Sequence, residues 1–161
     1  MLLTGVTGVG KSTVADAIGS VLTRAGTPTA VIDTDMLAQF GPPRGDSDFY
    51  DRLKCTNLAA VWANFRDAGA HFVVVSAVVD TQARRERYAA SLAGCEVRMV
   101  RLTAPAEVVR RRLLGRGRGE TPTLSATHAD VADFSVVNDR PPEQVAEEVI
   151  SRCFASRRRC R

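Results

Sequence analysis

Short apolar runs alternate along the chain with stretches in which apolar residues recur at helical spacing. In the stretch KSTVADAIGSVLTRAG, Val14, Ile18 and Leu22 fall on one face of a helix. The run HFVVVSAVV places β-branched residues side by side, which is typical of a parallel strand covered on both faces. The whole pattern predicts strands at residues 1–4, 29–33, 71–79, 96–103 and 134–138, and helices at 11–26, 53–69, 81–94, 105–116 and 141–154.

Five strands that alternate with helices predict an α/β fold, a three-layer doubly wound sheet of five parallel strands. The chain has 161 residues, the size of one ordinary domain, so we expect a single domain over residues 1–161. The segment 39–52, QFGPPRGDSDFYDR, is polar and contains glycine and proline, which predicts a loop between the second strand and the second helix.

The composition is that of an ordinary globular protein, with 45% hydrophobic and 25% charged residues. No apolar run reaches the roughly 18 residues that span a bilayer. No basic and apolar leader precedes the first strand, so we expect a cytoplasmic protein that does not bind a membrane. The four cysteines are too scattered for a zinc site, and we expect free thiols.

The basic residues do not by themselves indicate a nucleic-acid partner. The net charge is +4, and much of the excess lies in residues 110–118 and 157–161. A local basic cluster serves one anionic small ligand equally well. Aromatic residues make up only 6% of the chain and are not interleaved with the basic ones, so we do not expect nucleic-acid binding.

The segment Gly5–Thr13, GVTGVGKST, follows the first strand and opens the first helix, and it fits the phosphate-binding pattern G-x-x-x-x-G-K-[ST]. Glycines allow positive φ angles and let backbone N–H groups approach phosphate oxygens. Together with the positive end of the helix dipole, these amides form an anion site. The spacing differs from the G-x-G-x-x-G of dinucleotide folds, so the segment predicts an ATP-class nucleotide.

The polar side chains of this segment have distinct expected roles. Lys11 is one of only two lysines in a chain with 22 lysines and arginines, and its compact charge suits the β- and γ-phosphates better than a planar guanidinium. Ser12 offers a hydroxyl to Mg²⁺, and Thr13 can reach the α-phosphate.

Two carboxylates, Asp33 and Asp35, come directly after the second strand. Residues two apart on an extended segment point the same way. At the carboxyl end of a strand in an open α/β sheet, they face the ligand crevice. One could help to hold hydrated Mg²⁺ and the other could accept a proton from a substrate hydroxyl, and the sequence does not decide which does which.

With these motifs the chain resembles the small P-loop kinases: adenylylsulfate, gluconate, shikimate and nucleoside monophosphate kinases, and chloramphenicol phosphotransferase. The D-T-D of residues 33–35 is similar to a motif that carries metal and substrate contacts in several of them. The segments VVVSAVVDTQARRERY and LTAPAEVVRRRL resemble the middle of adenylylsulfate kinases. The resemblance implies a kinase with ATP and Mg²⁺ as cofactors.

The segment RLLGR, Arg112 to Arg116, resembles the lid of adenylate kinases. The resemblance implies that Arg112 lies along the adenine and that Arg116 reaches the phosphates. The two arginines are four apart and share one face of a helix. An arginine that closes on the γ-phosphate would stabilise the transferring charge and exclude water.

The acceptor is expected between Asp35, the segment 39–52 and the start of the third predicted helix at 81–94. Arg44, Arg52 and Arg84 are candidates for holding an anionic group of the acceptor.

We therefore expect an ATP-dependent phosphotransferase that phosphorylates a hydroxyl of a small metabolite, similar to adenylylsulfate kinase. The alternatives are a nucleoside monophosphate kinase and a non-catalytic P-loop module that binds nucleotide. The expected site comprises catalytic Lys11, Asp33, Asp35 and Arg116; nucleotide-binding Gly5, Thr7, Gly8, Val9, Gly10, Lys11, Ser12, Thr13 and Arg112; acceptor-binding Asp35, Arg44, Arg52 and Arg84; and metal-binding Ser12 and Asp33. The identity of the acceptor and the oligomeric state are not encoded in any motif of the chain.

Overall fold

A computed structural model of the chain describes residues 1–42, 45, 47–115 and 131–155. It contains a five-stranded sheet in which every pair of neighbouring strands is parallel, in the order β2–β3–β1–β4–β5. The strands are β1 (Leu2–Thr4), β2 (Thr29–Asp33), β3 (Phe72–Ser76), β4 (Met99–Thr103) and β5 (Phe134–Val137). The predicted α/β fold with five parallel strands is thus confirmed.

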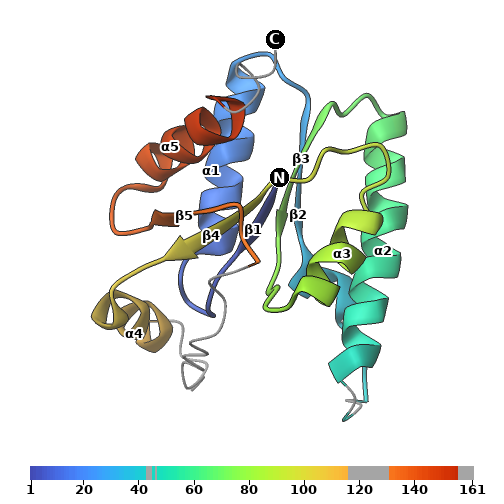
Figure 1. Ribbon diagram of the computed structural model, residues 1–161, viewed down its shortest axis with the longest axis horizontal. Coiled ribbons are helices and arrows are strands. Elements are labelled where there is room, and N and C mark those ends of the chain that lie inside the picture. The colour runs from blue at the N-terminus through green and yellow to red at the C-terminus, as the bar shows by residue number, and fades with distance from the viewer. Residues whose placement is uncertain (43–44, 46, 116–130, 156–161) are drawn as a thin grey trace.

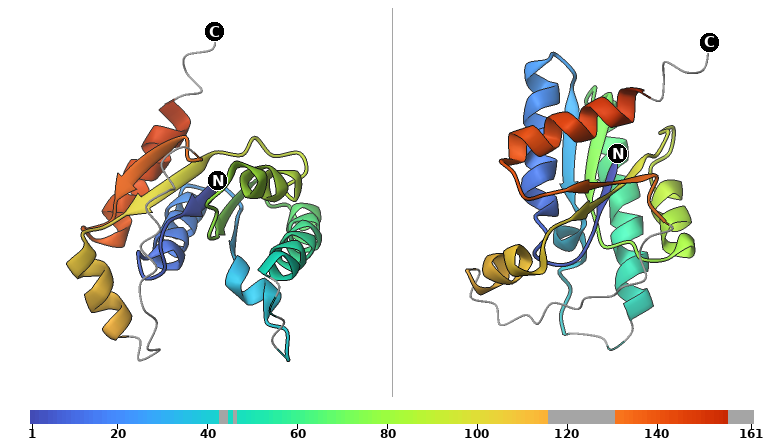
Figure 2. Two further views of the ribbon diagram at one scale, coloured as in Figure 1. Left: turned by 60° about the horizontal axis from the view of Figure 1, so that its bottom comes forward. Right: turned by 60° about the vertical axis from the view of Figure 1, so that its left-hand side comes forward.

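Helices cover both faces of this sheet (Figures 1 and 2). Helices α1 (Lys11–Arg24) and α5 (Pro142–Ala155) lie on one face, and α2 (Ser47–Asp67) and α3 (Gln82–Ala90) lie on the other. Helix α4 (Ala106–Leu114) lies beyond the end of β4, at the lower left of Figure 1. A short 3₁₀ helix, η1 (Thr34–Ala38), directly follows β2.

Two apolar cores result from the alternation of side chains along the strands. Leu3 and Val74 point into the core under α1 and α5, and Leu2 and Val75 point into the core under α2 and α3. The central strand β1 is only three residues long, and all three of its residues are buried. Among the described residues, no helix is both long enough and apolar enough to cross a membrane.

The central strand leads straight into the phosphate-binding segment, and Thr4 fixes its end. The Thr4 hydroxyl donates to the Val79 carbonyl and accepts from the Val79 N–H, both at 3.0 Å. Both residues are buried. The chain after β3 is thereby tied to the residue that precedes Gly5, and this contact sets the position of the loop that follows.

The structure differs from the sequence predictions at the start of α2 and at the end of β3. Helix α2 begins at Ser47, inside the segment 39–52 that was expected to be a loop. An acidic residue in its first turn, Asp48, stabilises this helical start through the helix dipole. Strand β3 ends at Ser76 rather than at residue 79, because the chain turns to place Val79 against Thr4.

We expect Thr4→Val to lower the free energy of unfolding by about 2–4 kcal/mol, because it leaves two buried backbone groups of Val79 without a partner. The side chain keeps its shape, so packing is preserved. Urea denaturation followed by circular dichroism measures the change.

The matched control is Thr103→Val at the end of β4. The Thr103 hydroxyl makes one long hydrogen bond, 3.4 Å to the Val136 carbonyl, and is half-buried. We expect this variant to lose less than about 1 kcal/mol. Equal losses in both variants would show that Thr4 does not fix the end of β1.

Candidate active site

The candidate site lies where β1 and β2 end, at the lower edge of the sheet in Figure 1. The phosphate-binding loop connects β1 to α1, and Gly10 caps the helix with φ 98° and ψ 25°. An L side chain rarely adopts this left-handed conformation. A left-handed residue followed by helical ones directs successive N–H groups to one concave surface, which binds anions.

Lys11 is buried at the first position of α1, and its side chain folds back over the loop. Its ammonium donates to the carbonyls of Gly5 at 3.0 Å and Val6 at 3.2 Å. The positive charge is thereby held at the mouth of the loop. Of the other residues expected to bind nucleotide, Thr7 and Thr13 are exposed, whereas Val9 is buried in the core under α1.

Ser12 and Asp33 meet at the junction of α1 and β2. The Ser12 hydroxyl donates to Oδ2 of Asp33 at 2.5 Å. The other carboxylate oxygen, Oδ1, accepts the N–H of Asp35 at 3.0 Å and so caps η1. The Asp33 carboxylate is therefore fixed in orientation beside the phosphate-binding loop.

The expectation that Asp33 and Asp35 point the same way is wrong. The chain stops being extended at Asp33 and enters the 3₁₀ helix η1, so the alternation of a strand no longer applies. The Asp35 side chain is 68% exposed and pairs with the ammonium of Lys54, on α2, at 2.7 Å. Asp33 thus faces the phosphate-binding loop, and Asp35 faces α2.

An apolar surface is formed by residues of η1, of the segment that follows it and of the start of α2. Met36 is 65% exposed and Phe40 is 47% exposed. The ring of Phe40 lies 5.6 Å from that of Phe49, which contacts the ring of Tyr50 at 5.2 Å in an edge-on arrangement. A ligand bound at Asp35 would lie beside apolar and aromatic side chains.

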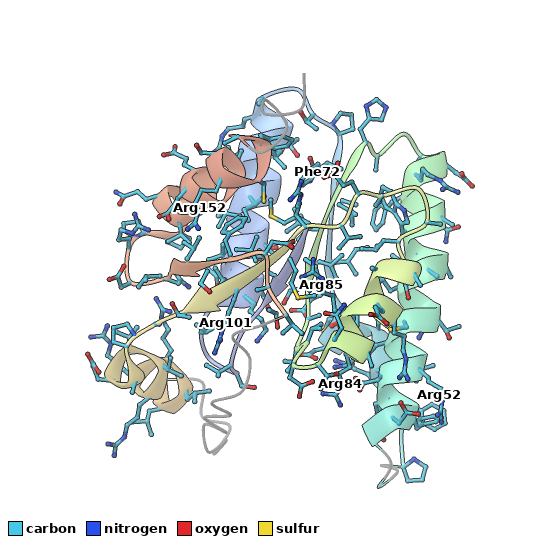
Figure 3. All side chains as sticks on the ribbon, viewed as in Figure 1. Arg52, Phe72, Arg84, Arg85, Arg101 and Arg152 are labelled. Atoms are coloured by element: carbon cyan, nitrogen blue, oxygen red, sulfur yellow. The ribbon has the colours of Figure 1, made fainter. Side chains whose placement is uncertain are left out.

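The two described arginines that were expected to bind the acceptor are paired with carboxylates. Arg84, on α3, contacts Asp51 and Asp80 at 2.7 Å each, and Arg52 pairs with Asp48. Figure 3 shows Arg84 at the lower end of α3, facing α2, and Arg52 at the lower end of α2.

These ion pairs affect the protonation of both partners. Burial lowers the pKa of the Arg84 guanidinium, but the hydrogen bonds and charges of Asp80 and Asp51 outweigh it and raise that pKa above its ordinary value. A hydrogen bond from Arg87 holds the pKa of the Asp48 carboxyl below its ordinary value. The pairs of Arg84 with Asp51 and of Arg87 with Asp48 join α2 to α3.

Two side chains donate hydrogen bonds to the same backbone carbonyl of the phosphate-binding loop, that of Val9. The guanidinium of Arg112, on α4, donates to the Val9 carbonyl at 3.0 Å. The side-chain amide of Asn138, directly after β5, donates to the same oxygen at 2.7 Å. The role of Arg112 along an adenine stays a prediction, and Arg44 and Arg116 lie outside the described residues.

Sequence reasoning gave no role to Lys54 or Asn138. The rarity of lysine was a usable signal, since the chain's two lysines both lie at this site. Asn138 follows a parallel strand, and the carboxyl ends of such strands face the ligand crevice. Its position was therefore a signal too.

The donor set at Ser12 and Asp33 fits Mg²⁺. A hydroxyl and a carboxylate are hard oxygen ligands, and Mg²⁺ binds proteins through one or two such groups while keeping waters and substrate phosphates. Among the described residues, no group of three or more His, Cys, Asp or Glu side chains could hold a metal without such help. The arrangement is suited to a metal that arrives with a nucleotide.

The chain is similar to known kinases in sequence and in structure. A family model described as "AAA domain" matches residues 1–141. Adenylyl-sulfate kinase of Paraburkholderia xenovorans (strain LB400) is 30% identical over 155 residues, which cover 92% of the chain and 79% of that protein.

Two solved structures share the fold. The tunicamycin resistance protein of Deinococcus radiodurans superimposes with a TM-score of 0.69 at 21% identity, covering 95% of this chain and 94% of that one. The APS kinase CysC of Mycobacterium tuberculosis, in complex with AMPPNP and APS, superimposes with a TM-score of 0.62 at 22% identity, covering 93% and 94%. The chain therefore belongs to the P-loop kinases, in the AAA-domain family that its residues 1–141 match.

Proposed function

We propose that this P-loop kinase transfers the γ-phosphoryl group of ATP to a hydroxyl of a small metabolite. The observation that carries the proposal is the contact of the Ser12 hydroxyl with the Asp33 carboxylate, 2.5 Å apart beside the phosphate-binding loop. A hydroxyl at the start of the helix and an aspartate after the next strand form the oxygen pair that a nucleotide-bound Mg²⁺ requires.

The geometry supports a division of labour between the two aspartates. Asp33 holds the metal with Ser12, and the metal supplies charge neutralisation for the phosphates when it is bound. Asp35 lies on the expected acceptor side, where Oδ1 accepts from Lys54 and no described residue donates a hydrogen bond to Oδ2. Asp35 can therefore take a hydrogen bond from an acceptor hydroxyl and orient it or receive its proton.

The arginine pairings favour a hydroxyl acceptor over a phosphate acceptor. Arg52 and Arg84 already contact carboxylates on α2 and α3. A phosphate of a nucleoside monophosphate would compete with these carboxylates for the guanidinium donors and would add a second negative group beside them. A hydroxyl at Asp35 meets no such competition.

The surface beside Asp35 suits an acceptor that carries an apolar or aromatic part. Met36 and Phe40 are exposed there, and the rings of Phe49 and Tyr50 continue the surface. Flat rings bind well to such side chains. Adenylyl sulfate, which the 30% identical relative is named for, is the first acceptor to test, with shikimate and gluconate as aliphatic comparisons.

We expect Lys11→Ala to weaken ATP binding at least tenfold and to abolish phosphoryl transfer, because the charge held over the loop is lost. Isothermal titration with a non-hydrolysable ATP analogue measures the affinity. Lys54→Ala is the matched control, since it removes the only other lysine of the chain. We expect it to keep the affinity for the analogue and to raise the KM for the acceptor. Loss of nucleotide affinity in both variants would contradict these assignments.

We expect Asp33→Asn and Asp35→Asn to fail in different ways. Asp33→Asn should raise the Mg²⁺ concentration needed for half-maximal activity about tenfold or more, because a charged ligand of the metal is removed. Asp35→Asn should lower kcat about a hundredfold or more while the Mg²⁺ requirement stays unchanged, because the acceptor hydroxyl loses its proton acceptor.

Coupled kinase assays over a Mg²⁺ titration separate the two outcomes. Full turnover by Asp35→Asn with an acceptor that the unmodified chain phosphorylates would rule out its role toward the hydroxyl. An unchanged Mg²⁺ requirement in Asp33→Asn would rule out the metal site at Ser12 and Asp33.

A further inference from the structure

Asn138 links the end of β5 to the phosphate-binding loop. It is only 3% exposed, and its backbone N–H donates to the Thr103 carbonyl at 2.7 Å, which fixes its main chain beside β4. Its side-chain Nδ2 donates to the Val9 carbonyl at 2.7 Å. Arg112 donates to the same carbonyl at 3.0 Å, so this oxygen is held from two sides.

The hydrogen bonds that fix the Val9 carbonyl also determine where the Gly10 N–H of the same peptide points. The peptide between Val9 and Gly10 is trans, since the cis peptide found in the described residues is Gly41–Pro42. In a planar trans peptide the C=O and N–H groups point in opposite directions. When Asn138 binds the Val9 carbonyl on one side, the Gly10 N–H is directed to the other side.

That other side is where the loop would bind anions. Gly10 has the left-handed conformation and Lys11 begins the helix, which is the backbone sequence of an anion-binding nest. The first-turn N–H groups of a helix have no partner within the helix and point the same way. The Gly10 N–H therefore joins the amides that would contact the phosphates.

The chemistry of the side chain shows why an amide stands here. Among the described residues, nothing hydrogen-bonds to Oδ1 of Asn138, although this atom is buried. A buried acceptor without a partner lowers stability, and an apolar side chain would avoid this cost. An aspartate would turn lone pairs toward the Val9 carbonyl. Unlike either of these side chains, the amide provides a donor at Nδ2.

The packing leaves no room for a side chain between Gly10 and this donor. A Cβ atom added at Gly10 would lie 2.5 Å from Nδ2 of Asn138 and 3.5 Å from the Arg112 guanidinium. The amide is thus in direct contact with the backbone that it orients.

We propose that Asn138 is a positioning residue for phosphate binding: through the Val9 carbonyl it orients the Gly10 N–H toward the polyphosphate. This inference rests on the proposed function, in which the loop binds the phosphates of ATP. It assigns to Asn138 an effect on the phosphates and none on the nucleoside.

The test measures binding of inorganic tripolyphosphate and of ADP by isothermal titration in buffer without divalent metal, so that Asp33 does not contribute. Asn138→Leu removes the donor and Asn138→Asp removes it while keeping the shape. We expect both variants to bind both ligands about tenfold more weakly than the unmodified chain, as the loss of one oriented hydrogen bond implies. If Asn138→Leu does not fold, Asn138→Asp gives the readout.

The matched control is Asn57→Leu. The Asn57 side-chain amide also donates to a backbone carbonyl, that of Leu37 at 2.6 Å, but on the opposite face of the sheet. Its removal should lower the unfolding midpoint and leave the tripolyphosphate affinity unchanged. A purely structural role of Asn138 would give the same result for both asparagines.

Three outcomes would overturn the inference. Folded Asn138 variants that bind tripolyphosphate as tightly as the unmodified chain would show that the Gly10 N–H does not depend on this side chain. A loss confined to ADP would place Asn138 against the nucleoside. If the unmodified chain bound neither ligand, the proposed function would be refuted as well. That result differs from an unchanged affinity in the Asn138 variants, so failure of the proposed function and failure of this inference can be told apart.

Discussion

The hydrogen bond between the Ser12 hydroxyl and the Asp33 carboxylate is the contact on which the site depends. It joins the first turn of α1 to the last residue of β2. Because the strands are parallel, their carboxyl ends share one edge, and polar residues from distant segments meet there. The parallel order of the strands is therefore a functional requirement as much as a structural one.

Charge is distributed over this edge in two separate places. Lys11 brings one ammonium to the phosphate-binding loop, and Lys54 brings the other to Asp35 on the far side of Asp33. Nearby arginines are engaged with carboxylates between α2 and α3, where they join the helices. A lysine offers a compact charge that can approach several oxygens, whereas a guanidinium is fixed in a planar fork. The chain places both of its lysines where the ligand is expected, whereas Arg84 and Arg87 join helices α2 and α3.

The fold could be predicted from the sequence because the strands are short apolar runs and most helices carry a regular apolar period. The phosphate-binding loop could be predicted because its residues are contiguous. The 3₁₀ helix η1 could not, since five residues are too short for a periodic signal, and this error placed Asp35 beside Asp33. The contact of Asn138 with Val9 spans 129 positions of sequence and joins a side chain to a backbone oxygen, which leaves no pattern in either segment. Contacts of this kind depend on the completed sheet.

Several backbone carbonyls of the phosphate-binding loop accept hydrogen bonds from side chains of the protein. The carbonyls of Gly5 and Val6 accept from Lys11, and that of Val9 accepts from Asn138 and Arg112. A carbonyl turned toward a polyphosphate would repel it, so every carbonyl that binds a protein donor removes one source of repulsion and directs an N–H group the other way. Glycine gives the loop the freedom to take this conformation, and the donors around it select the conformation from those that glycine allows. In the proposed site, anion binding thus depends also on Arg112 and Asn138, which lie near the end of α4 and directly after β5, far along the chain from the loop.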